Sequence, residues 1–311
     1  MAAPARVAVV DLGTNSTRLL IADVQDGSVS ELDRRTTVTR LGDGVDTSGR
    51  LSDEAMQRVL HTLASYKQRI DELQAATTVA VATSAVRDAA NGDEFRAALK
   101  QRFGIDARII PGEEEGRLTF RGATAQRSNA DARDTLVIDI GGGSTEYVVG
   151  TPGAEPGFHV STRMGSVRHT ERHLAHDPPT AAELERARRQ IAEVIRQDVP
   201  ERIRTTTDTG IAVAGTATSL AAIELELDPY DSDRVHGHQL TRTAIERILG
   251  QLAALTTEQR RHTKGLHPDR APTIVAGAAI LAESLRAFDL DHVEVSEADI
   301  LHGCALITSK R

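Results

Sequence analysis

Hydrophobic and polar positions at the start of the chain predict three strands of an antiparallel meander. Residues 6–12, 17–24 and 29–40 are rich in apolar and β-branched side chains and are separated by short polar segments. Asp26-Gly27, between the second and third runs, is typical of a two-residue hairpin turn. The first 40 residues are therefore expected to form a small sheet.

Helical spacing follows this meander. In residues 52–73, Val59, Leu63, Tyr66 and Ile70 recur at steps of three and four. This spacing places them on one face of a helix, which predicts an amphipathic helix packed on the sheet.

From residue 77 onward, short apolar runs alternate with helical patterns. Strands are predicted at 77–82, 107–110, 158–163, 211–214 and 292–296. Helices are predicted at 92–103, 113–127, 180–197, 241–255 and 269–288, and further helices at the Gly215 segment and from Asp299. Asn91 with Glu94, and Thr180 with Glu183, have the spacing of a capping box. This alternation predicts an α/β protein.

One pattern occurs twice. Residues 8–21 read AVVDLGTNSTRLLI and residues 136–149 read LVIDIGGGSTEYVV, so that Asp11 aligns with Asp139 and Arg18 with Glu146. A spacing of 128 residues is too long for a solenoid, whose repeats span about 20–50 residues, and it predicts two related domains.

The boundary between these domains is expected at residues 128–133, which are polar and have no periodicity. We assign 1–127 to a first domain and 128–311 to a second, with a last helix that could pack back toward the first.

Composition excludes several classes of function. Aromatic residues make up 3% of the chain, there is no Trp and the net charge is −8, which argues against DNA as a partner. The single cysteine, Cys304, excludes a disulfide within the chain and is expected to be a small buried residue. Neither a signal peptide nor a membrane span is recognisable, so we expect a cytoplasmic protein with no membrane partner.

The repeated segments predict two phosphate-binding hairpins. Each is expected to have a strand that ends in an Asp, a turn rich in small residues, and a returning strand. Glycines in the turns would allow positive φ and close approach to an anion, and successive NH groups would form a nest for phosphate. Asp11 and Asp139 could bind Mg²⁺ beside that phosphate. The expected phosphate ligands are Gly13, Thr14, Asn15, Ser16, Gly141, Gly142, Gly143, Ser144 and Thr145. The simpler alternative is that these turns are only tight hairpins.

Other small-residue and charged segments could complete such a site. Gly215 and Thr216 lie in a turn between a strand and a helix, where free NH groups also bind anions. Glu113, Glu114 and Glu115 open a helix, and one of them could accept a proton from water, although acids also favour helix N-termini.

Basic residues and histidines leave more alternatives open. Arg87 is either a phosphate ligand or a solvated residue at a helix start. An anion channel could be lined by some of Arg163, Arg168, Lys264, His267 and Arg270. The histidines His169, His173, His176, His236 and His238 are expected on the surface or at caps rather than in a metal site.

Four motifs together resemble the exopolyphosphatase/guanosine pentaphosphate phosphohydrolase (Ppx/GppA) family. They are DLGTNS at 11–16, TSAVR at 83–87, PGEEEGRL at 111–118 and DIGGGSTE at 139–146. The resemblance extends over the chain, which looks like a short form without the C-terminal helical extension of longer members. It implies the actin/Hsp70/sugar-kinase (ASKHA) superfold, with two ribonuclease-H-like domains and a cleft between them.

The resemblance also implies the roles of individual residues. Glu115 corresponds to the family's catalytic base, with Glu114 beside it. Asp139 and Glu146 correspond to groups that bind metal or orient water, and Arg87 to a phosphate ligand. The implied cofactor is Mg²⁺, with another divalent ion such as Mn²⁺ as an alternative, and a homodimer is plausible.

We therefore expect an exopolyphosphatase, a phosphoric anhydride hydrolase in which Asp11, Asp139 and Glu146 hold the metal and Glu115 activates water. Without the extension, short polyphosphate chains or a small nucleotide become the more plausible substrates. The alternatives are a pppGpp 5′-phosphatase, a kinase of the same superfold, and a polyphosphate or alarmone sensor without activity. The late segment SEADILHGCAL differs from the more basic, Gly-rich form expected there.

Overall fold

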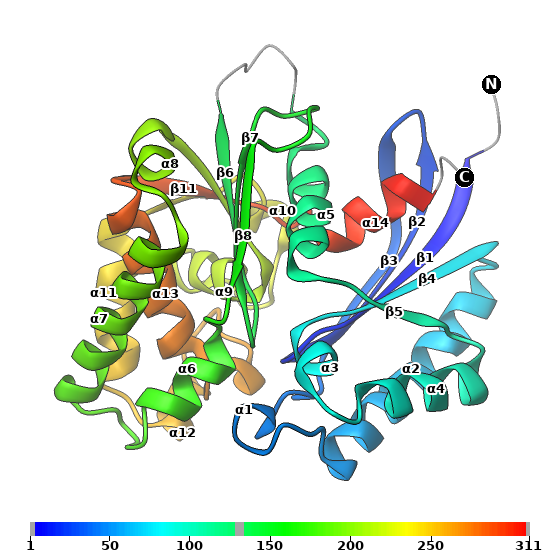
Figure 1. Cartoon of the computed structure of the whole chain (residues 1–311), viewed down its shortest axis with the longest axis horizontal. Helices are drawn as coiled ribbons and strands as arrows, with labels where there is room; N and C mark the ends of the chain where they lie inside the picture. The colour runs from blue at the N-terminus through cyan, green and yellow to red at the C-terminus, as the bar shows by residue number, and fades with distance from the viewer. Residues whose placement is uncertain (1–3, 128–133, 309–311) are drawn as a thin grey trace. The chain divides into compact units, whose positions relative to one another are not determined.

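The computed structural model describes residues 4–127 and 134–308 and divides the chain into two compact units (Figure 1). Unit 1 consists of Met1–Gln126 with Ala298–Arg311, and unit 2 consists of Arg127–Glu297. The expected boundary at 128–133 lies outside the described residues. The prediction assigns the segment from Ala298 to the second domain and lets its last helix pack back toward the first. The structure places this segment in unit 1, where that helix packs on the sheet.

Unit 1 is built on a five-stranded sheet in the order β3-β2-β1-β4-β5. The strands are β1 (Ala5–Leu12), β2 (Ser16–Gln25), β3 (Ser28–Val38), β4 (Thr77–Ala82) and β5 (Ala107–Ile109). The first three form the predicted meander, and Asp26 and Gly27 both have positive φ, as a hairpin turn of type I′ requires. Because β1, β4 and β5 are parallel, their carboxyl ends meet at one edge of the sheet.

Helices cover both faces of this sheet (Figure 1). The helices of unit 1 are α1 (Val45–Ser48), α2 (Asp53–Glu72), α3 (Ser84–Asp88), α4 (Gly92–Phe103), α5 (Gly112–Thr124) and α14 (Ile300–Thr308). On one face, Ala8 and Val10 share a core with α2, α3 and α4. On the other face, Val7 and Val9 share a core with α5 and α14. The alternation along β1 thus separates two apolar layers.

Unit 2 repeats this topology and adds one strand, β10, which pairs antiparallel with β11 at the edge of the sheet. Its sheet has the order β10-β11-β9-β6-β7-β8. The strands are β6 (Thr135–Ile140), β7 (Thr145–Gly150), β8 (Phe158–Thr162), β9 (Thr209–Val213), β10 (Gln239–Thr241) and β11 (His292–Val295). Strands β6, β7 and β8 form an antiparallel meander, and β9 and β11 continue parallel to β6, as β4 and β5 do beside β1. Both units are ribonuclease-H-like, which confirms the predicted ASKHA fold.

The helices of unit 2 pack around a larger core. They are α6 (Ser166–His173), α7 (Ala181–Asp198), α8 (Glu201–Thr206), α9 (Ala214–Glu224), α10 (Ser232–Val235), α11 (Arg242–Ala253), α12 (Thr257–Arg260), the 3₁₀ turn η1 (Pro268–Arg270) and α13 (Ile274–Ala287). Helix α13 is buried over most of its length, from Ile274 to Leu285. The helix predicted from residue 269 therefore begins at Ile274, after a separate 3₁₀ turn.

The two predicted capping boxes have different outcomes. Thr180 and Glu183 form a complete one at the start of α7. Asn91 does not cap α4, because its side-chain oxygen accepts the NH of Leu51 and its amide donates to the Leu51 carbonyl. The Asn91 side chain, which the spacing predicted to cap α4, therefore binds the backbone of a loop 40 residues away in sequence.

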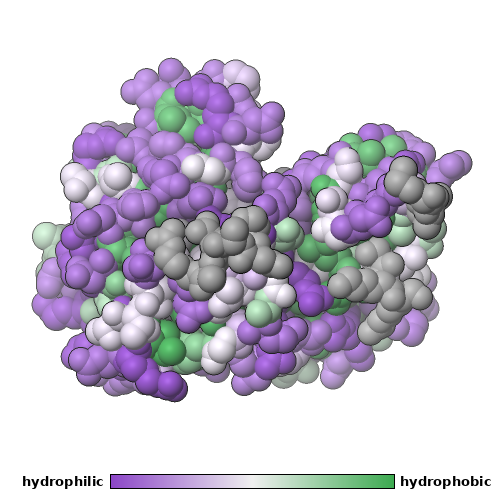
Figure 2. Space-filling view, turned by 90° about the horizontal axis from the view of Figure 1, so that it is seen from above, coloured by the Kyte–Doolittle hydropathy of each residue, from purple (hydrophilic) through white to green (hydrophobic). Residues whose placement is uncertain are grey.

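The surface is mostly polar. On the face drawn in Figure 2, hydrophilic residues predominate and hydrophobic ones form small, separate patches. Within the described part of the chain, the exposed large hydrophobic side chains are those of Leu32 and Tyr230. In the same residues, no helix combines the length and the apolar character that crossing a bilayer requires.

Candidate active site

The first repeated segment forms a hairpin at the carboxyl edge of the unit 1 sheet. Asp11 on β1 lies directly opposite Arg18 on β2, and the NH of Gly13 donates to the Ser16 carbonyl at 3.0 Å. The carbonyl of Asn15 accepts hydrogen bonds from the NH groups of residues 39 and 40, and that of Thr14 accepts one from residue 42. A neighbouring loop thus holds the carbonyl side of the turn.

The second repeated segment has the same geometry in unit 2. Asp139 lies opposite Glu146, and the NH of Gly141 donates to the Ser144 carbonyl, again at 3.0 Å. Here helix α6 takes the place of the loop, because its first NH groups donate to the Gly141 and Gly142 carbonyls. Two unrelated segments therefore hold the two turns in the same way.

Glycine in these turns serves close packing rather than positive φ, which corrects the prediction. Neither Gly13 nor Gly141 has a positive φ. A Cβ on Gly13 would lie 2.8 Å from the Ser16 carbonyl oxygen, and one on Gly141 would lie 3.1 Å from that of Ser144. The tight turn therefore excludes a side chain at Gly13 and leaves little room at Gly141.

The NH groups of the turns remain available to a ligand. Those of Thr14, Asn15, Gly142 and Gly143 donate no hydrogen bond to any residue in 4–127 or 134–308. Because the carbonyls are held by neighbouring segments, the NH side of each turn can accommodate an anion. Three of the predicted ligands are engaged within the protein instead. The NH groups of Gly13 and Gly141 donate to the Ser16 and Ser144 carbonyls, and the buried hydroxyl of Thr145 donates to the Met164 carbonyl at 2.5 Å.

Asp11 is buried at the base of the first turn. Two nitrogens of Arg18 contact its Oδ2 atom, Nε at 2.9 Å and Nη2 at 2.7 Å. The Oδ1 atom is buried and accepts no hydrogen bond from the described residues. Burial raises the pKa of Asp11 above its usual range, although Arg18 opposes that shift. A buried carboxylate oxygen of this kind is suited to a cation or to a ligand that brings one.

Glu115 lies at the same edge of the sheet, in the first turn of α5. It is the buried member of the three glutamates, with 8% exposure, and its Oε2 lies 3.2 Å from Nη1 of Arg87. Arg87, on α3, also donates to the carbonyl of Ile110, which follows β5. The structure thus brings together two residues that the sequence singled out separately.

Glu114 points elsewhere. Both of its oxygens accept hydrogen bonds from Arg108, at 2.8 and 2.6 Å, in a pair at the surface. The geometry therefore assigns Glu114 a structural contact and leaves Glu115 as the buried carboxylate of this turn.

In unit 2, Asp139 and Glu146 place two buried carboxylates on neighbouring strands. The Oε1 atom of Glu146 accepts a hydrogen bond from Ser161 on β8 at 2.6 Å. Directly opposite residues of an antiparallel pair lie on the same face. The second hairpin therefore carries two acidic groups where the first carries an Asp–Arg pair.

The third predicted phosphate loop follows β9. Ala214 has φ +63°, and a Cβ on Gly215 would lie 1.8 Å from Nη1 of Arg270. The guanidinium of Arg270 is therefore packed directly on the Gly215 backbone. Thr216 is buried against Gly277 of α13. The loop places an arginine beside the first turn of α9, where the helix dipole also favours an anion.

The other predicted basic residues do not gather at this loop. Arg168 is buried and donates to the Gly143 carbonyl, so it supports the second hairpin. Lys264 lies 3.7 Å from Glu226 at the surface, and His267 caps the turn η1. Arg163 is exposed.

His169 contradicts the prediction of surface histidines. It is fully buried in α6, and its Nε2 lies 2.8 Å from the Gln190 Oε1. Burial, with a smaller contribution from His173, lowers its pKa to about 4. His176, in contrast, is exposed and contacts Glu183, and His238 contacts Glu224.

The residues present fit Mg²⁺ bound in the manner usual beside phosphates. Within the described ranges, no three His, Cys, Asp or Glu side chains converge on one point as a ready-made cage. Mg²⁺ typically uses one or two carboxylates and completes its shell with water and phosphate oxygens. The buried Oδ1 of Asp11 and the Asp139–Glu146 pair are donors of that type.

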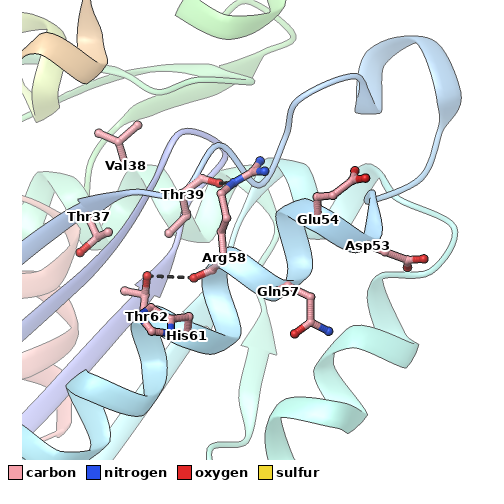
Figure 3. A pocket seen from close by; sticks show the side chains of 9 residues that line it. All are labelled: Thr37, Val38, Thr39, Asp53, Glu54, Gln57, Arg58, His61 and Thr62. Atoms are coloured by element: carbon pink, nitrogen blue, oxygen red, sulfur yellow. Dashed lines mark hydrogen bonds between the residues drawn. The ribbon is translucent and has the colours of Figure 1, made fainter.

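A hollow of about 660 Å³ lies elsewhere in unit 1, between the end of β3 and helix α2 (Figure 3). Figure 3 shows Arg58 extending from α2 toward Thr39, whose carbonyl accepts from its Nε at 2.7 Å. None of the predicted site residues lines this hollow. It adjoins the loop that holds the first hairpin, at Thr39, and is not the candidate active site.

Sequence reasoning missed the partners of the predicted groups. Asp299 contacts Arg18 across 281 residues of chain, and Ser161 contacts Glu146. The alignment of Arg18 with Glu146 was the one available signal, because it showed that the two hairpins differ in charge at that position.

Known proteins resemble this chain over most of its length. A model of the Ppx/GppA phosphatase family matches residues 20–309. The chain is 37% identical to Exopolyphosphatase 2 of Mycobacterium tuberculosis, over 97% of this chain and 98% of that protein. It is 28% identical to a guanosine-5′-triphosphate,3′-diphosphate pyrophosphatase of Photobacterium profundum, over 95% of this chain and 58% of that protein. The crystal structure of an exopolyphosphatase-like protein, 33% identical, covers the whole chain with a TM-score of 0.93, and 99% of that protein is covered.

Proposed function

The chain belongs to the Ppx/GppA phosphatase family, and from this premise we propose that it is an exopolyphosphatase that removes the terminal phosphate of inorganic polyphosphate. The observation that carries the proposal is the pair of matching hairpins. Each has a buried carboxylate beside a turn with available NH groups. The similarity to a protein named exopolyphosphatase supports this choice of substrate.

In this proposal the chain's own groups bind and orient the phosphates. The NH groups of Thr14, Asn15, Gly142 and Gly143 donate to phosphate oxygens. Arg87 and Arg270 supply positive charge. Asp11, Asp139 and Glu146 would hold Mg²⁺, which would neutralise further charge on the phosphate oxygens. Positioning and electrostatic stabilisation supply most of the rate in phosphoryl transfer.

Glu115 is the proposed base. It accepts a proton from water as the water oxygen bonds to the terminal phosphorus, and the bond from that phosphorus to the next bridging oxygen breaks. The products are orthophosphate and a chain shortened by one unit, and no covalent enzyme intermediate is formed. Arg87, 3.2 Å from the Glu115 carboxylate, fixes its position.

A second candidate substrate is pppGpp, with the same chemistry and a different leaving group. The similarity to a guanosine-5′-triphosphate,3′-diphosphate pyrophosphatase favours it. This activity would use the same hairpins and the same base, so the choice depends on the relative turnover of the two substrates.

The proposal is tested by phosphate release with Mg²⁺ from short polyphosphate, long polyphosphate, pppGpp and ATP. Glu115→Gln should reduce turnover by about 10²–10⁴-fold, because general-base catalysis typically contributes that much. The matched control is Glu113→Gln, which changes an exposed glutamate of the same helical turn and should retain activity.

The outcomes separate the candidates. Release from polyphosphate that collapses in Glu115→Gln supports the exopolyphosphatase and its base. Release from pppGpp alone moves the protein to the second candidate. If Glu115→Gln retains near-normal turnover, the base is wrong, and if no substrate is hydrolysed, a sensor without activity is the better description.

A further inference from the structure

A carboxylate from the end of the chain lies beside the first hairpin. Asp299 precedes helix α14 and is 1% exposed. Its Oδ2 accepts a hydrogen bond from Nη1 of Arg18 and lies 3.7 Å from Nη2 of Arg34. Its Oδ1 accepts the NH of Leu301 at 2.9 Å. Both oxygens of this buried side chain are therefore engaged, and the carboxylate has one orientation.

Arg18 connects this carboxylate to Asp11. While Nη1 contacts Asp299, Nε and Nη2 both contact the same oxygen of Asp11, Oδ2. A guanidinium donates through a rigid planar fork, so fixing one end of Arg18 also fixes the other. The rotation of the Asp11 carboxylate is then determined, with Oδ1 left as the atom that accepts no hydrogen bond from the described residues.

The charges around Arg18 also favour a cation at Asp11. If Asp11 alone faced Arg18, the pair would be neutral and a poor attraction for a cation. Asp299 shares the same guanidinium, Arg34 also faces Asp299, and Glu31 faces Arg34. Three carboxylates thus stand against two guanidinium groups, so Asp11 retains part of its negative charge for a cation. In the second hairpin the position opposite Asp139 is the acidic Glu146, and no such compensation is needed.

The backbone of Asp299 is also fixed against the helix that carries Glu115. A Cβ on Gly122 of α5 would lie 1.9 Å from the Asp299 carbonyl oxygen, and one on Gly303 of α14 would lie 1.9 Å from that of Leu118. The two helices cross in backbone contact. Asp299 therefore cannot shift without moving α5.

We propose that Asp299 is a positioning residue that holds Arg18 so that Oδ1 of Asp11 is directed to the cation and phosphate. This inference rests on the proposed function, in which Asp11 is a cation ligand. It assigns Arg18 a supporting role toward Asp11 rather than direct contact with substrate.

The test compares Asp299→Asn with Asp33→Asn. The first removes the charge that faces Arg18 and keeps the size and an oxygen for the Leu301 NH. The second neutralises a mostly buried carboxylate of β3, 14% exposed, that is paired with Arg35 and Arg69. We expect Asp299→Asn to raise the Mg²⁺ concentration for half-maximal activity at least tenfold, while Asp33→Asn leaves it unchanged.

Two further readouts do not depend on turnover. A crystal structure of Asp299→Asn should show Arg18 moved and the Asp11 carboxylate rotated, and thermal unfolding reports the stability of each variant. If Asp299→Asn does not fold, Arg18→Lys takes its place, because one ammonium cannot span both carboxylates and should produce the same shift in Mg²⁺ dependence.

The outcomes distinguish this inference from the proposed function. If Asp11→Asn shifts the Mg²⁺ dependence and Asp299→Asn does not, the positioning role is wrong and the proposed function stands. If Asp11→Asn also leaves the Mg²⁺ dependence unchanged, the cation role of Asp11 fails. If Arg18→Lys raises the KM for substrate alone, Arg18 contacts the phosphate directly and the inference is overturned.

Discussion

Ala214 adopts the left-handed backbone conformation that glycine usually provides. Its φ is +63°, at the junction of β9 and α9 beside the proposed phosphate loop. An L-residue there has strain of about 1–2 kcal/mol. Ala214→Gly should therefore be neutral or stabilise the protein by up to about 1 kcal/mol in urea unfolding, once the greater freedom of glycine in the unfolded chain is subtracted.

The matched control lies in the same helix. Ala217→Gly changes a fully buried residue with ordinary helical φ and should destabilise by about 1 kcal/mol or more. Equal losses in the two variants would show that Ala214 is not strained.

His169 should make stability depend on pH. Its Nε2 donates to Gln190, and its buried Nδ1 accepts no hydrogen bond from the described residues, so a proton added there has no acceptor. Its pKa in the folded state is lowered to about 4 from 6.5. A lowered pKa favours the folded state above pH 6.5, and this contribution, about 3 kcal/mol, is lost as the pH falls through 4.

Urea unfolding between pH 7 and 4 measures this effect. The loss of stability should be smaller by that amount in His169→Gln, which does not titrate. His262→Gln, at a histidine with a 79% exposed side chain, should behave like the wild type. If the free energy of unfolding of His169→Gln falls with pH as steeply as that of the wild type, other groups cause the effect.

At the scale of elements, the crossing of α5 and α14 determines where Glu115 and Asp299 lie. Gly303→Ala places a Cβ 1.9 Å from the Leu118 carbonyl oxygen, and backbone atoms cannot yield as a side-chain tip can. We expect a loss of about 1–3 kcal/mol, typical of overpacking, together with lower activity.

Gly250→Ala in α11 is the control. A Cβ at Gly250 meets no atom within 4 Å, and alanine is the better helix former. It should therefore stabilise by about 0.5–1 kcal/mol in the same thermal unfolding assay. A Gly303→Ala variant as stable as the wild type would show that the helices can separate without cost.

The elements show which patterns could be predicted from the sequence. Strand β4 at 77–82 and helix α4 at 92–103 were predicted with the bounds that the structure has, because their apolar periodicity is local. Helix α6 was missed, since it has eight residues and its burial depends on the second hairpin that it holds. The cap at Asn91 failed for a related reason: Leu51, 40 residues away, uses that side chain.

The candidate site could be predicted only in part. The repeated Asp-x-Gly segments identified both hairpins, because the chemistry and the turn lie in one stretch of sequence. The choice of Glu115 over Glu114 came from the family resemblance, and the burial of Glu115 and the pairing of Glu114 with Arg108 agree with it. The contact from Asp299 to Arg18 joins residues 281 positions apart and has no local signature.

At the scale of the whole molecule, the two copies of the repeated hairpin carry different residues opposite the same Asp. The five strands of the first sheet and five of the six in the second have the same order, and both turns use a hydrogen bond from the first Gly to the following Ser carbonyl. The partner position differs, with Arg18 in one copy and Glu146 in the other. In the first copy, Arg18 is therefore paired with a second carboxylate, that of Asp299, which lies outside the repeated segment. In the second copy, Glu146 itself supplies the second carboxylate.

Unit 1 is interrupted in sequence by the whole of unit 2, and this has a consequence for synthesis on the ribosome. Chains begin to fold from their N-terminus as they are made. Residues 127–297 emerge before helix α14, so unit 2 has all of its strands and helices while unit 1 still lacks one of the two helices that cover one face of its sheet. The apolar layer that contains Val7, Val9 and Leu20 is covered only in part during that interval. The hairpin with Asp11 thus obtains its last support only after unit 2 has been made, and a chain that lacks α14 should be both inactive and a target for chaperones.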